Sequence, residues 1–307
     1  YQPITWDNAF NLIANELNAL PSPDDAVFYT SGRTSNEAAF MYQLFVRMFG
    51  TNNLPDCSNM CHESSGVALS ETVGIGKGSV TLDDFNEAEV ILVIGQNPGT
   101  NHPRMLSALK KAKLRGAKII TINPLPEAGI IKFKDPQSVS DVMGGGVSLT
   151  DLFLQVRING DVPLMKAILK RLLELERKSP GSVFDQAFIE SKTAGYQDLC
   201  DDLDRYHFSN LCEESGVQQA EVEAAVNLLA NTDKIIACWA MGLTQHKNGI
   251  DNIQEVVNLL LAKGSIGKPG TGTCPVRGHS NVQGDRTMGI WEKPKPEFLD
   301  KLGEHFH

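Results

Sequence analysis

Three short runs of apolar, β-branched residues predict buried strands of a parallel sheet. They are Val90–Gly95, Lys118–Asn123 and Lys234–Trp239. A helical apolar stripe over Met105–Arg115 joins the first two runs. Strand, helix and strand within about thirty residues form a βαβ unit, whose crossover is right-handed in nearly all proteins. The pattern therefore predicts an α/β fold.

Most of the remaining apolar positions recur at helical spacing. Asp7 and Ser35 are candidate N-caps for the first two helices, and Gly50 is expected to end the second. Ala26–Ser31 is a fourth, shorter strand candidate. The predicted helices span residues 7–20, 36–49, 64–72, 105–115, 149–158, 164–178, 184–191, 196–205, 217–231 and 252–262. Two stretches are predicted to be irregular, 124–148 and 264–284.

Composition and charge narrow the class of protein. The 307 residues are 41% hydrophobic and 21% charged, as in ordinary globular proteins. A net charge of −9 without any basic block argues against a nucleic-acid partner. The sequence shows no apolar run long enough to cross a bilayer and no signal peptide, so we expect a cytoplasmic location. The six cysteines are scattered, which suits a reducing compartment better than a disulfide framework.

The segment Asp56–Gly66 concentrates reactive side chains. It holds Cys57 and Cys61, and His62 follows the second cysteine directly. A thiol beside an imidazole can serve as a metal ligand, a nucleophile or a redox centre. A zinc site is disfavoured, because structural zinc takes four ligands and no second Cys/His pair stands at a comparable spacing. The alternative is that both cysteines are ordinary, inert thiols.

Amides and glycines follow all three predicted strands. The loops begin at Gly95, Asn123 and Met241, and in an open α/β sheet ligands bind beyond the carboxyl ends of the strands. Amide side chains and exposed backbone N–H groups suit phosphates, ribose hydroxyls and purine edges, so a nucleotide-like ligand is predicted. The alternative is that these residues only form turns. The loop Gly74–Ser79 lacks both standard phosphate-binding patterns, which argues against ATP.

Arg277 is a candidate ligand for a carboxylate. It follows a run of glycines, which allow the backbone to approach a ligand closely. Its planar guanidinium matches a carboxylate through two parallel hydrogen bonds. The alternative is a solvated arginine on the protein surface.

Five motifs spread over nearly the whole chain point to one enzyme family. They are S-G-R-T-S-N-E (31–37), C-S-N-M-C-H (57–62), V-I-G-Q-N-P-G-T-N-H-P (93–103), M-G-L-T-Q-H-x-N-G (241–249) and P-V-R-G-H-S-N-V-Q-G (275–284). In this order and at this spacing they resemble the molybdopterin-guanine-dinucleotide oxidoreductases. The nearest branch is that of the formate dehydrogenase alpha subunit and its formate-dehydrogenase-like members.

The resemblance implies a role for each candidate residue. Cys61 stands where that family places its metal ligand, so it would bind molybdenum or tungsten beside the sulfurs of two pterin cofactors, a bis-molybdopterin guanine dinucleotide. Arg277 would hold the carboxylate of formate, and His62 would accept or relay a proton. His279, the fourth catalytic candidate, stands where formate dehydrogenases carry glutamine. The residues that would bind the cofactors are Gln96, Asn97, Thr100, Asn123, Met241, Gly242, Gln245, Asn281 and Gln283.

The resemblance also implies that the chain is the central part of a larger enzyme. A segment that binds a 4Fe-4S cluster would precede it, and a further cofactor domain would follow. Residues 57–279 would form a doubly wound, Rossmann-like domain, and residues 1–56 with 280–307 part of a second α/β domain. Family members usually carry an acidic residue where this chain has Asn123. On its own, the piece is expected to bind cofactor weakly and to be inactive.

The implied activity is the two-electron oxidation of a small substrate, formate to carbon dioxide, with an electron acceptor that the sequence does not identify. Two alternatives stay open. A non-catalytic relative would keep the fold for binding or regulation, which the departures at Asn123 and His279 favour. A metal-free domain that binds a guanine nucleotide is the third reading.

Overall fold

The computed structural model describes residues 1–306, apart from the side chain of Ser140. His307, the end of the smaller predicted domain, lies outside the described residues. Helices alternate with short, mostly parallel strands, which confirms the predicted α/β class. Among the described helices, none combines the length and apolarity that a bilayer crossing requires.

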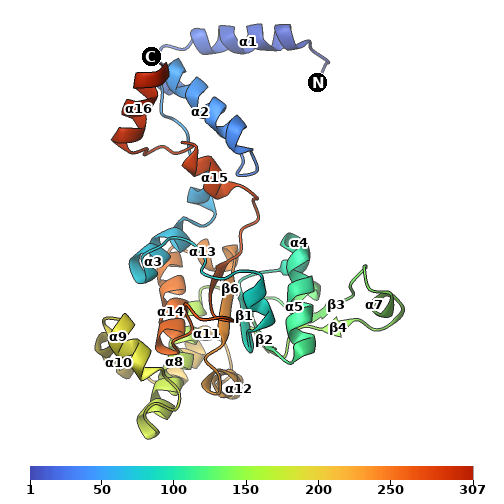
Figure 1. The fold of residues 1–307 in the computed structure, drawn as a ribbon, viewed down its shortest axis with the longest axis vertical. Helices are drawn as coiled ribbons and strands as arrows, with labels where there is room; N and C mark the ends of the chain where they lie inside the picture. The colour runs from blue at the N-terminus through green and yellow to red at the C-terminus, as the bar shows by residue number, and fades with distance from the viewer. Residues whose placement is uncertain (307) are drawn as a thin grey trace. The chain divides into compact units, whose positions relative to one another are not determined.

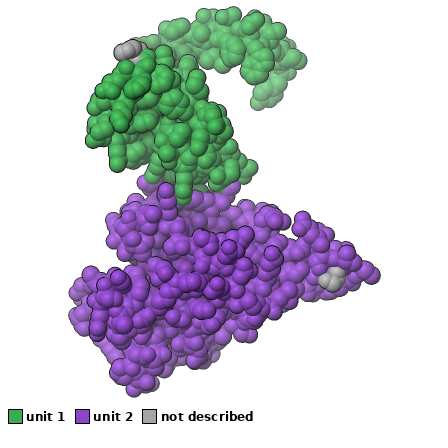
Figure 2. Space-filling model, viewed as in Figure 1, with its two compact units in different colours: residues 1–61, 279–307 green, residues 62–278 purple. Residues whose placement is uncertain are grey.

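The described chain divides into two compact units. Unit 1 comprises residues 1–61 with 279–307, and unit 2 comprises residues 62–278 (Figure 1; Figure 2). The sequence-based prediction places the two boundaries after residues 56 and 279. In the structure, the chain passes between the units directly after Cys61 and directly after Gly278.

The core of unit 2 is a five-stranded, all-parallel sheet in the order β5–β2–β1–β6–β7. The strands are β1 (Val90–Ile94), β2 (Lys118–Ile122), β5 (Leu152–Leu154), β6 (Ile235–Trp239) and β7 (Gly272–Pro275). Val90 of β1 aligns with Lys118 on one side and with Ile235 on the other. The chain builds outward from β1 in one direction and then in the other, which confirms the doubly wound order. The strand order reverses between β1 and β6, where such folds bind ligands.

Helices cover both faces of this sheet, which explains why its central strands are apolar at every position. Along β1, Leu92 and Ile94 face one side, while Ile91 and Val93 face the other. On the second side lies α5 (Pro103–Arg115), well separated from α8 and α14 in Figure 1. The first side packs against α3 (Glu63–Val73), α8 (Asp161–Lys178), α12 (Gln219–Ala230) and α14 (Gly249–Ala262).

The structure contradicts the sequence pattern at the two outer strands. The helix predicted over 149–158 is wrong, because Leu152–Leu154 pairs in parallel with Ile120–Ile122 as β5. The stretch 264–284, predicted to be irregular, contains β7, whose Gly272–Pro275 pairs with β6. Tertiary pairing outweighs local propensity in both places. β5 is only three residues long, and β7 includes a glycine and a proline.

The other elements of unit 2 are short, and most were predicted as helical or irregular. In the irregular stretch 124–148, Lys132–Phe133 (β3) pairs antiparallel with Val147–Ser148 (β4). The remaining elements are η3 (Asp83–Asn86), α4 (Pro98–Asn101), α6 (Ala128–Ile131), α7 (Val139–Met143), α9 (Gln186–Lys192), α10 (Tyr196–Asp204), α11 (Phe208–Ser215) and α13 (Met241–Thr244).

Unit 1 is helical, and its described residues include no strand. The strand predicted over Ala26–Ser31 is wrong: the Phe28 N–H donates to the Asn53 carbonyl at 2.9 Å, but no paired ladder follows. Its elements are α1 (Trp6–Asn18), η1 (Pro23–Asp25), α2 (Asn36–Phe49), η2 (Cys57–Met60), α15 (Val282–Thr287) and α16 (Pro296–Phe306).

The helix caps of unit 1 show which local signals hold. Ser35 caps α2 as predicted, because its hydroxyl accepts a hydrogen bond from the backbone N–H of Ala38. Gly50 ends the same helix with a left-handed φ of 107°. Asp7 is not the cap of α1: Thr5 takes that role by accepting from the N–H of Asn8 at 3.3 Å.

Candidate active site

The loops that follow β1 and β6 touch backbone to backbone at the point where the strand order reverses. The Gly242 N–H donates to the Gly95 carbonyl at 3.0 Å. A Cβ on Gly242 would lie 2.5 Å from the Gly95 Cα, and Gly95 itself has a left-handed φ of 56°. Only glycine fits at both positions. The contact brings two of the three predicted ligand loops together.

Gln96 stands directly beyond β1 and is 2% exposed. Its amide Nε2 donates to His102 Nδ1 at 3.2 Å and to Met105 Sδ at 3.1 Å. Its Oε1 is buried without a hydrogen-bond partner among the described residues. A buried polar atom left in this state is costly in free energy unless a ligand supplies the missing donor.

The neighbouring candidates serve local turns. Asn97 Oδ1 accepts from the Thr100 N–H at 3.2 Å and so caps the four-residue helix α4. Asn123, beyond β2, is buried, and its Nδ2 donates to the Leu125 carbonyl at 2.8 Å and to Glu127 Oε2 at 3.3 Å. Asn123 therefore keeps a carboxylate beside it, although the residue itself carries no charge.

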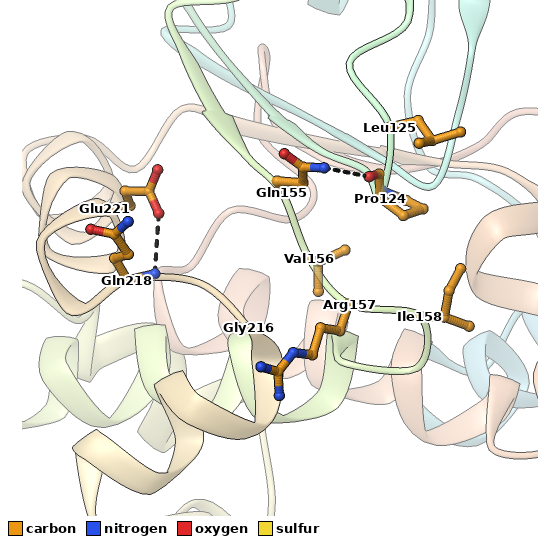
Figure 3. Close-up of a pocket in the computed structure, with 9 residues that line it drawn as sticks. All are labelled: Pro124, Leu125, Gln155, Val156, Arg157, Ile158, Gly216, Gln218 and Glu221. Carbon is orange, nitrogen blue, oxygen red and sulfur yellow. Dashed lines mark hydrogen bonds between the residues drawn. The ribbon is translucent and has the colours of Figure 1, made fainter.

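A cleft of about 660 Å³ opens at the carboxyl ends of β2 and β5 (Figure 3). One wall carries Gln155, whose Nε2 donates to the Pro124 carbonyl at 3.0 Å. On the other, the Gln218 N–H donates to Glu221 Oε2 at 3.1 Å. The cleft mixes apolar and polar groups, which suits an aromatic ring with hydrogen-bonding edges. Its lining residues are Pro124, Leu125, Gln155, Val156, Arg157, Ile158, Gly216, Gln218 and Glu221.

His62 is 2% exposed and uses both ring nitrogens. Nε2 lies 3.1 Å from the Val276 carbonyl, and Nδ1 lies 3.0 Å from Ser65 Oγ, which accepts from Trp239 Nε1 at 2.9 Å. Because a carbonyl only accepts, Nε2 carries the proton and Nδ1 accepts from the Ser65 hydroxyl. Burial, together with the nearby positive charge of Arg277, lowers the pKa of His62 to about 4. The imidazole is therefore neutral at physiological pH.

Arg277 lies close enough to His62 to influence its charge, so the structure brings these two predicted residues together within unit 2. The Val276 N–H donates to the Trp239 carbonyl at 2.8 Å, which extends the pairing of β7 with β6 up to the residue before Arg277. The backbone of Val276, the residue before Arg277, is thus held from two sides, by β6 and by the His62 ring.

Two further loop candidates, Met241 and Gln245, lie at the two ends of α13, which follows β6. Met241 is the first residue of this helix and is exposed, while Gln245 caps its end through a backbone bond to the Met241 carbonyl at 3.1 Å. Both positions flank the glycine contact between the β1 and β6 loops.

The remaining candidates belong to unit 1. Cys57 is 5% exposed, and its Sγ lies 3.5 Å from His279 Nδ1. Cys61 is half-buried and caps η2, where its N–H donates to the Ser58 carbonyl at 3.0 Å. The two cysteines of the motif therefore differ: one is packed against a histidine, and the other ends the segment just before unit 2 begins.

Asn281 and Gln283 of unit 1 also differ in their surroundings. The Asn281 amide donates to the Thr34 carbonyl at 2.7 Å and to Asn36 Oδ1 at 2.8 Å, so it ties the start of α15 to the start of α2. Gln283 is exposed on α15. Asn281 thus has a structural role in unit 1 whatever ligand it meets.

Comparison with known proteins identifies the family. The molybdopterin oxidoreductase family model matches residues 1–290. The chain belongs to the molybdopterin oxidoreductase family. It is 56% identical to an uncharacterized oxidoreductase of Mycobacterium bovis over all of this chain and 39% of that protein. It is 46% identical to protein YdeP of Escherichia coli, again over all of this chain and over 41% of that protein.

Two more distant matches bear on chemistry and fold. The F420-dependent formate dehydrogenase 2 subunit alpha of Methanococcus maripaludis is 30% identical over 98% of this chain and 41% of that subunit. Acetylene hydratase from Pelobacter acetylenicus shares the fold, with a TM-score of 0.67 and 20% identity over 88% of this chain and 34% of that one. The chain thus spans well under half the length of each of these four proteins.

The described residues fit the pterin cofactor, with molybdenum or tungsten, that membership of the molybdopterin oxidoreductase family implies. Gly95 and Gly242 place no side chain at the strand ends, where folds of this kind bind ligands. The buried Oε1 of Gln96, the second residue after β1, has no hydrogen-bond partner among the described residues and could accept from a ligand. The predicted cofactor residues of unit 2 are Gln96, Asn97, Thr100, Asn123, Met241, Gly242 and Gln245, and those of unit 1 are Asn281 and Gln283.

Sequence reasoning missed a buried acid near the cleft. Asp161 begins α8 just beyond β5, and burial raises its pKa to about 6, while His246 opposes that rise. Asn159, two residues earlier, has a left-handed φ of 65°. The turn Asn159-Gly160-Asp161 could have indicated this residue, because it marks a loop beyond a strand. The wrong prediction of a helix over 149–158 left that strand unrecognised.

Ser65 is predicted to be essential for the stability of unit 2. Ser65→Ala leaves two buried groups, His62 Nδ1 and Trp239 Nε1, without a partner, so the free energy of unfolding should fall by about 2–5 kcal/mol. Urea unfolding measures this change. Ser70→Ala, on the exposed side of the same helix, is the control and should cost less than about 0.5 kcal/mol. Equal stability of the two variants would contradict the hydrogen-bond chain.

The pKa of His62 predicts a pH dependence. Unfolding raises that pKa from about 4 to the ordinary 6.5, so the unfolded chain binds more protons between these values. The contribution of His62 to the free energy of unfolding is therefore fully present above pH 6.5. It is lost as the pH falls toward 4, by up to ~3 kcal/mol. Asp161, whose raised pKa gives the opposite slope, is present in both proteins when wild type is compared with His62→Gln.

Urea unfolding at several pH values between 4 and 7 measures this difference. Wild type should lose stability relative to His62→Gln as the pH falls. An NMR titration of the imidazole provides an independent check, because the ring should stay neutral at pH 5.5. A parallel pH dependence of the two proteins, together with a ring that titrates near 6.5, would show that His62 is not held as described.

Proposed function

We propose that the whole protein is a molybdenum- or tungsten-dependent bis-molybdopterin-guanine-dinucleotide oxidoreductase that oxidises a small carboxylate, with formate as the first candidate. The observation that carries this proposal is the arrangement of Arg277 beside a buried, neutral His62, with Cys61 preceding that histidine. The similarity to a formate dehydrogenase alpha subunit supports it. The relatives at 56% identity support only the oxidoreductase class.

Arg277 would bind the substrate carboxylate. It would supply the positive charge that attracts the carboxylate, beside a His62 ring that is itself neutral. The two hydrogen bonds of the preceding Val276 backbone, to β6 and to His62, would fix where Arg277 leaves the sheet and so help to orient the substrate before reaction.

Cys61 would supply a thiolate ligand, which suits a soft, redox-active metal. When bound, the metal and its sulfur ligands supply a two-electron acceptor. His62 would accept a proton at Nδ1 if the Ser65 hydroxyl turned away, since Nε2 is already donated to Val276. His279, beside Cys57 in unit 1, is the fourth proposed catalytic residue.

The cofactor would lie over the strand ends of unit 2. The glycine pair and the amides of Gln96 and Asn97 would meet phosphates and ribose hydroxyls, and the cleft at β2 and β5 would take a guanine. Glu127, held beside Asn123, would supply the negative charge that Asn123 lacks. We further propose a cytoplasmic location, a 4Fe-4S cluster in the whole protein, and a weakly binding, inactive state for this piece alone.

Kinetics of the full-length protein test the proposal. Purified protein should contain molybdenum or tungsten with guanine nucleotide, and should reduce a viologen dye with formate. Arg277→Lys should raise KM by about 10–100-fold with a smaller change in kcat, because a bidentate, charge-assisted pair is lost. Arg104→Lys, at an exposed arginine, is the matched control and should behave as wild type.

Cys61→Ser separates the alternatives. Activity should fall by at least about 100-fold, as expected for a metal ligand. A metal-free protein that still binds guanine nucleotide, unaffected by changes at Cys61 or Arg277, would support the nucleotide-binding alternative. A metal-loaded protein without activity towards any small carboxylate would support the non-catalytic alternative.

A further inference from the structure

Cys238 and Cys274 are register partners on the neighbouring parallel strands β6 and β7. Partners in register point to the same face of a sheet, and both residues belong to the packing on the face that carries α5. Neighbouring strands run about 4.8 Å apart, which lies within the Cα separation of roughly 4.4–6.8 Å that disulfides span. The sheet itself therefore sets these two side chains opposite one another.

The two thiols are chemically unequal. Cys238 is 0% exposed, and its S–H donates to the sulfur of Cys274, which lowers the pKa of Cys274, while burial raises the pKa of Cys238. Cys274 is only half-buried. An oxidant would thus meet the more acidic thiol first. The other buried pair, Cys200 and Cys212, lies on helices against the opposite face of the sheet.

We propose that Cys238 and Cys274 form a reversible disulfide when the protein meets hydrogen peroxide. The Cys274 thiolate attacks the peroxide oxygen, which gives a sulfenic acid and releases hydroxide or water. The Cys238 thiol then attacks the sulfenyl sulfur, the S–S bond forms, and a second water leaves. The two thiols lose two electrons in total, and these reduce the O–O bond of the peroxide.

The disulfide would form close to the proposed substrate-binding residue Arg277. Cys274 stands three residues before Arg277 on the segment whose Val276 carbonyl accepts from His62. A covalent link between β6 and β7 at this level would alter the backbone that supports Arg277. The modification itself requires neither metal nor pterin, so it is independent of the proposed function.

Peptide mapping tests the proposal. The protein is treated with hydrogen peroxide, remaining thiols are blocked with N-ethylmaleimide under denaturing conditions, and trypsin is added. Cys238 lies in the peptide 235–247 and Cys274 in 264–277, because trypsin does not cut between Lys268 and Pro269. We expect these two peptides to appear as one linked species that dithiothreitol separates, with two of the six thiols lost to the label.

Variants make the result specific. Cys274→Ala, at the half-buried position, should abolish the linked species, and Cys238→Ala should leave Cys274 as a sulfinic acid instead. Cys212→Ala, in the opposite face, is the control and should form the link as wild type does. The proposal is overturned if both peptides carry N-ethylmaleimide after peroxide treatment, or if the peptide 48–77, which holds Cys57 and Cys61, is the only one to lose label.

Discussion

One hydrogen-bond chain holds together the part of unit 2 that carries the proposed chemistry. It runs from the indole of Trp239 through the Ser65 hydroxyl to the His62 ring and ends at the Val276 carbonyl. It thereby joins β6, the start of α3 and the end of β7, which are far apart in the sequence. A buried polar group without a hydrogen-bond partner costs free energy. The removal of any member of the chain therefore leaves its neighbours unpaired and destabilises the fold.

This constraint decides the state of the histidine. A ring that donates through Nε2 to a carbonyl and accepts at Nδ1 is neutral and fixed in one tautomer. The positive charge of Arg277 lies near enough to the ring to lower the pKa of His62 and so to favour this neutral state. His62 therefore first supports the backbone of Val276, which precedes Arg277, and any proton transfer to Nδ1 has to break its hydrogen bond with Ser65.

The sheet supplies the second half of the arrangement. The reversal of strand order between β1 and β6 brings two loops together, and glycines at 95 and 242 let their backbones touch. The chain leaves unit 1 after Cys61 and returns to it after Gly278, so both connections between the units fall next to proposed catalytic residues.

Sequence reasoning succeeded where one physical signal dominates. The strands β1, β2 and β6 are buried on both faces, and their apolar runs show this directly. It failed for β5 and β7, because a three-residue strand and a Gly- and Pro-containing strand exist only through their neighbours. The strand expected over Ala26–Ser31 failed for the opposite reason, since an extended apolar segment without a ladder is no strand.

For the candidate site, too, some features could be predicted from the sequence and others could not. The motifs singled out Cys61, His62 and Arg277, whose catalytic roles stay predictions, whereas the family that the motifs predicted is confirmed. No local pattern could reveal the neutral state of His62, because that state depends on burial and on the charge of Arg277, which lies far along the chain. Asp161 was missed because residues 149–158 were predicted to be a helix. Ligand-binding residues were sought only beyond predicted strands, and the strand β5 that precedes Asp161 was not among them.

The central claim is that Cys61 is a ligand of a molybdenum or tungsten centre in the whole protein. X-ray absorption at the metal edge tests it most directly, because the method counts sulfur neighbours whatever the substrate is. The full-length Cys61→Ser protein should lose one sulfur from the metal's coordination shell and gain one oxygen, relative to wild type. An unchanged sulfur shell in that variant, or full-length protein that holds neither metal, would contradict the account.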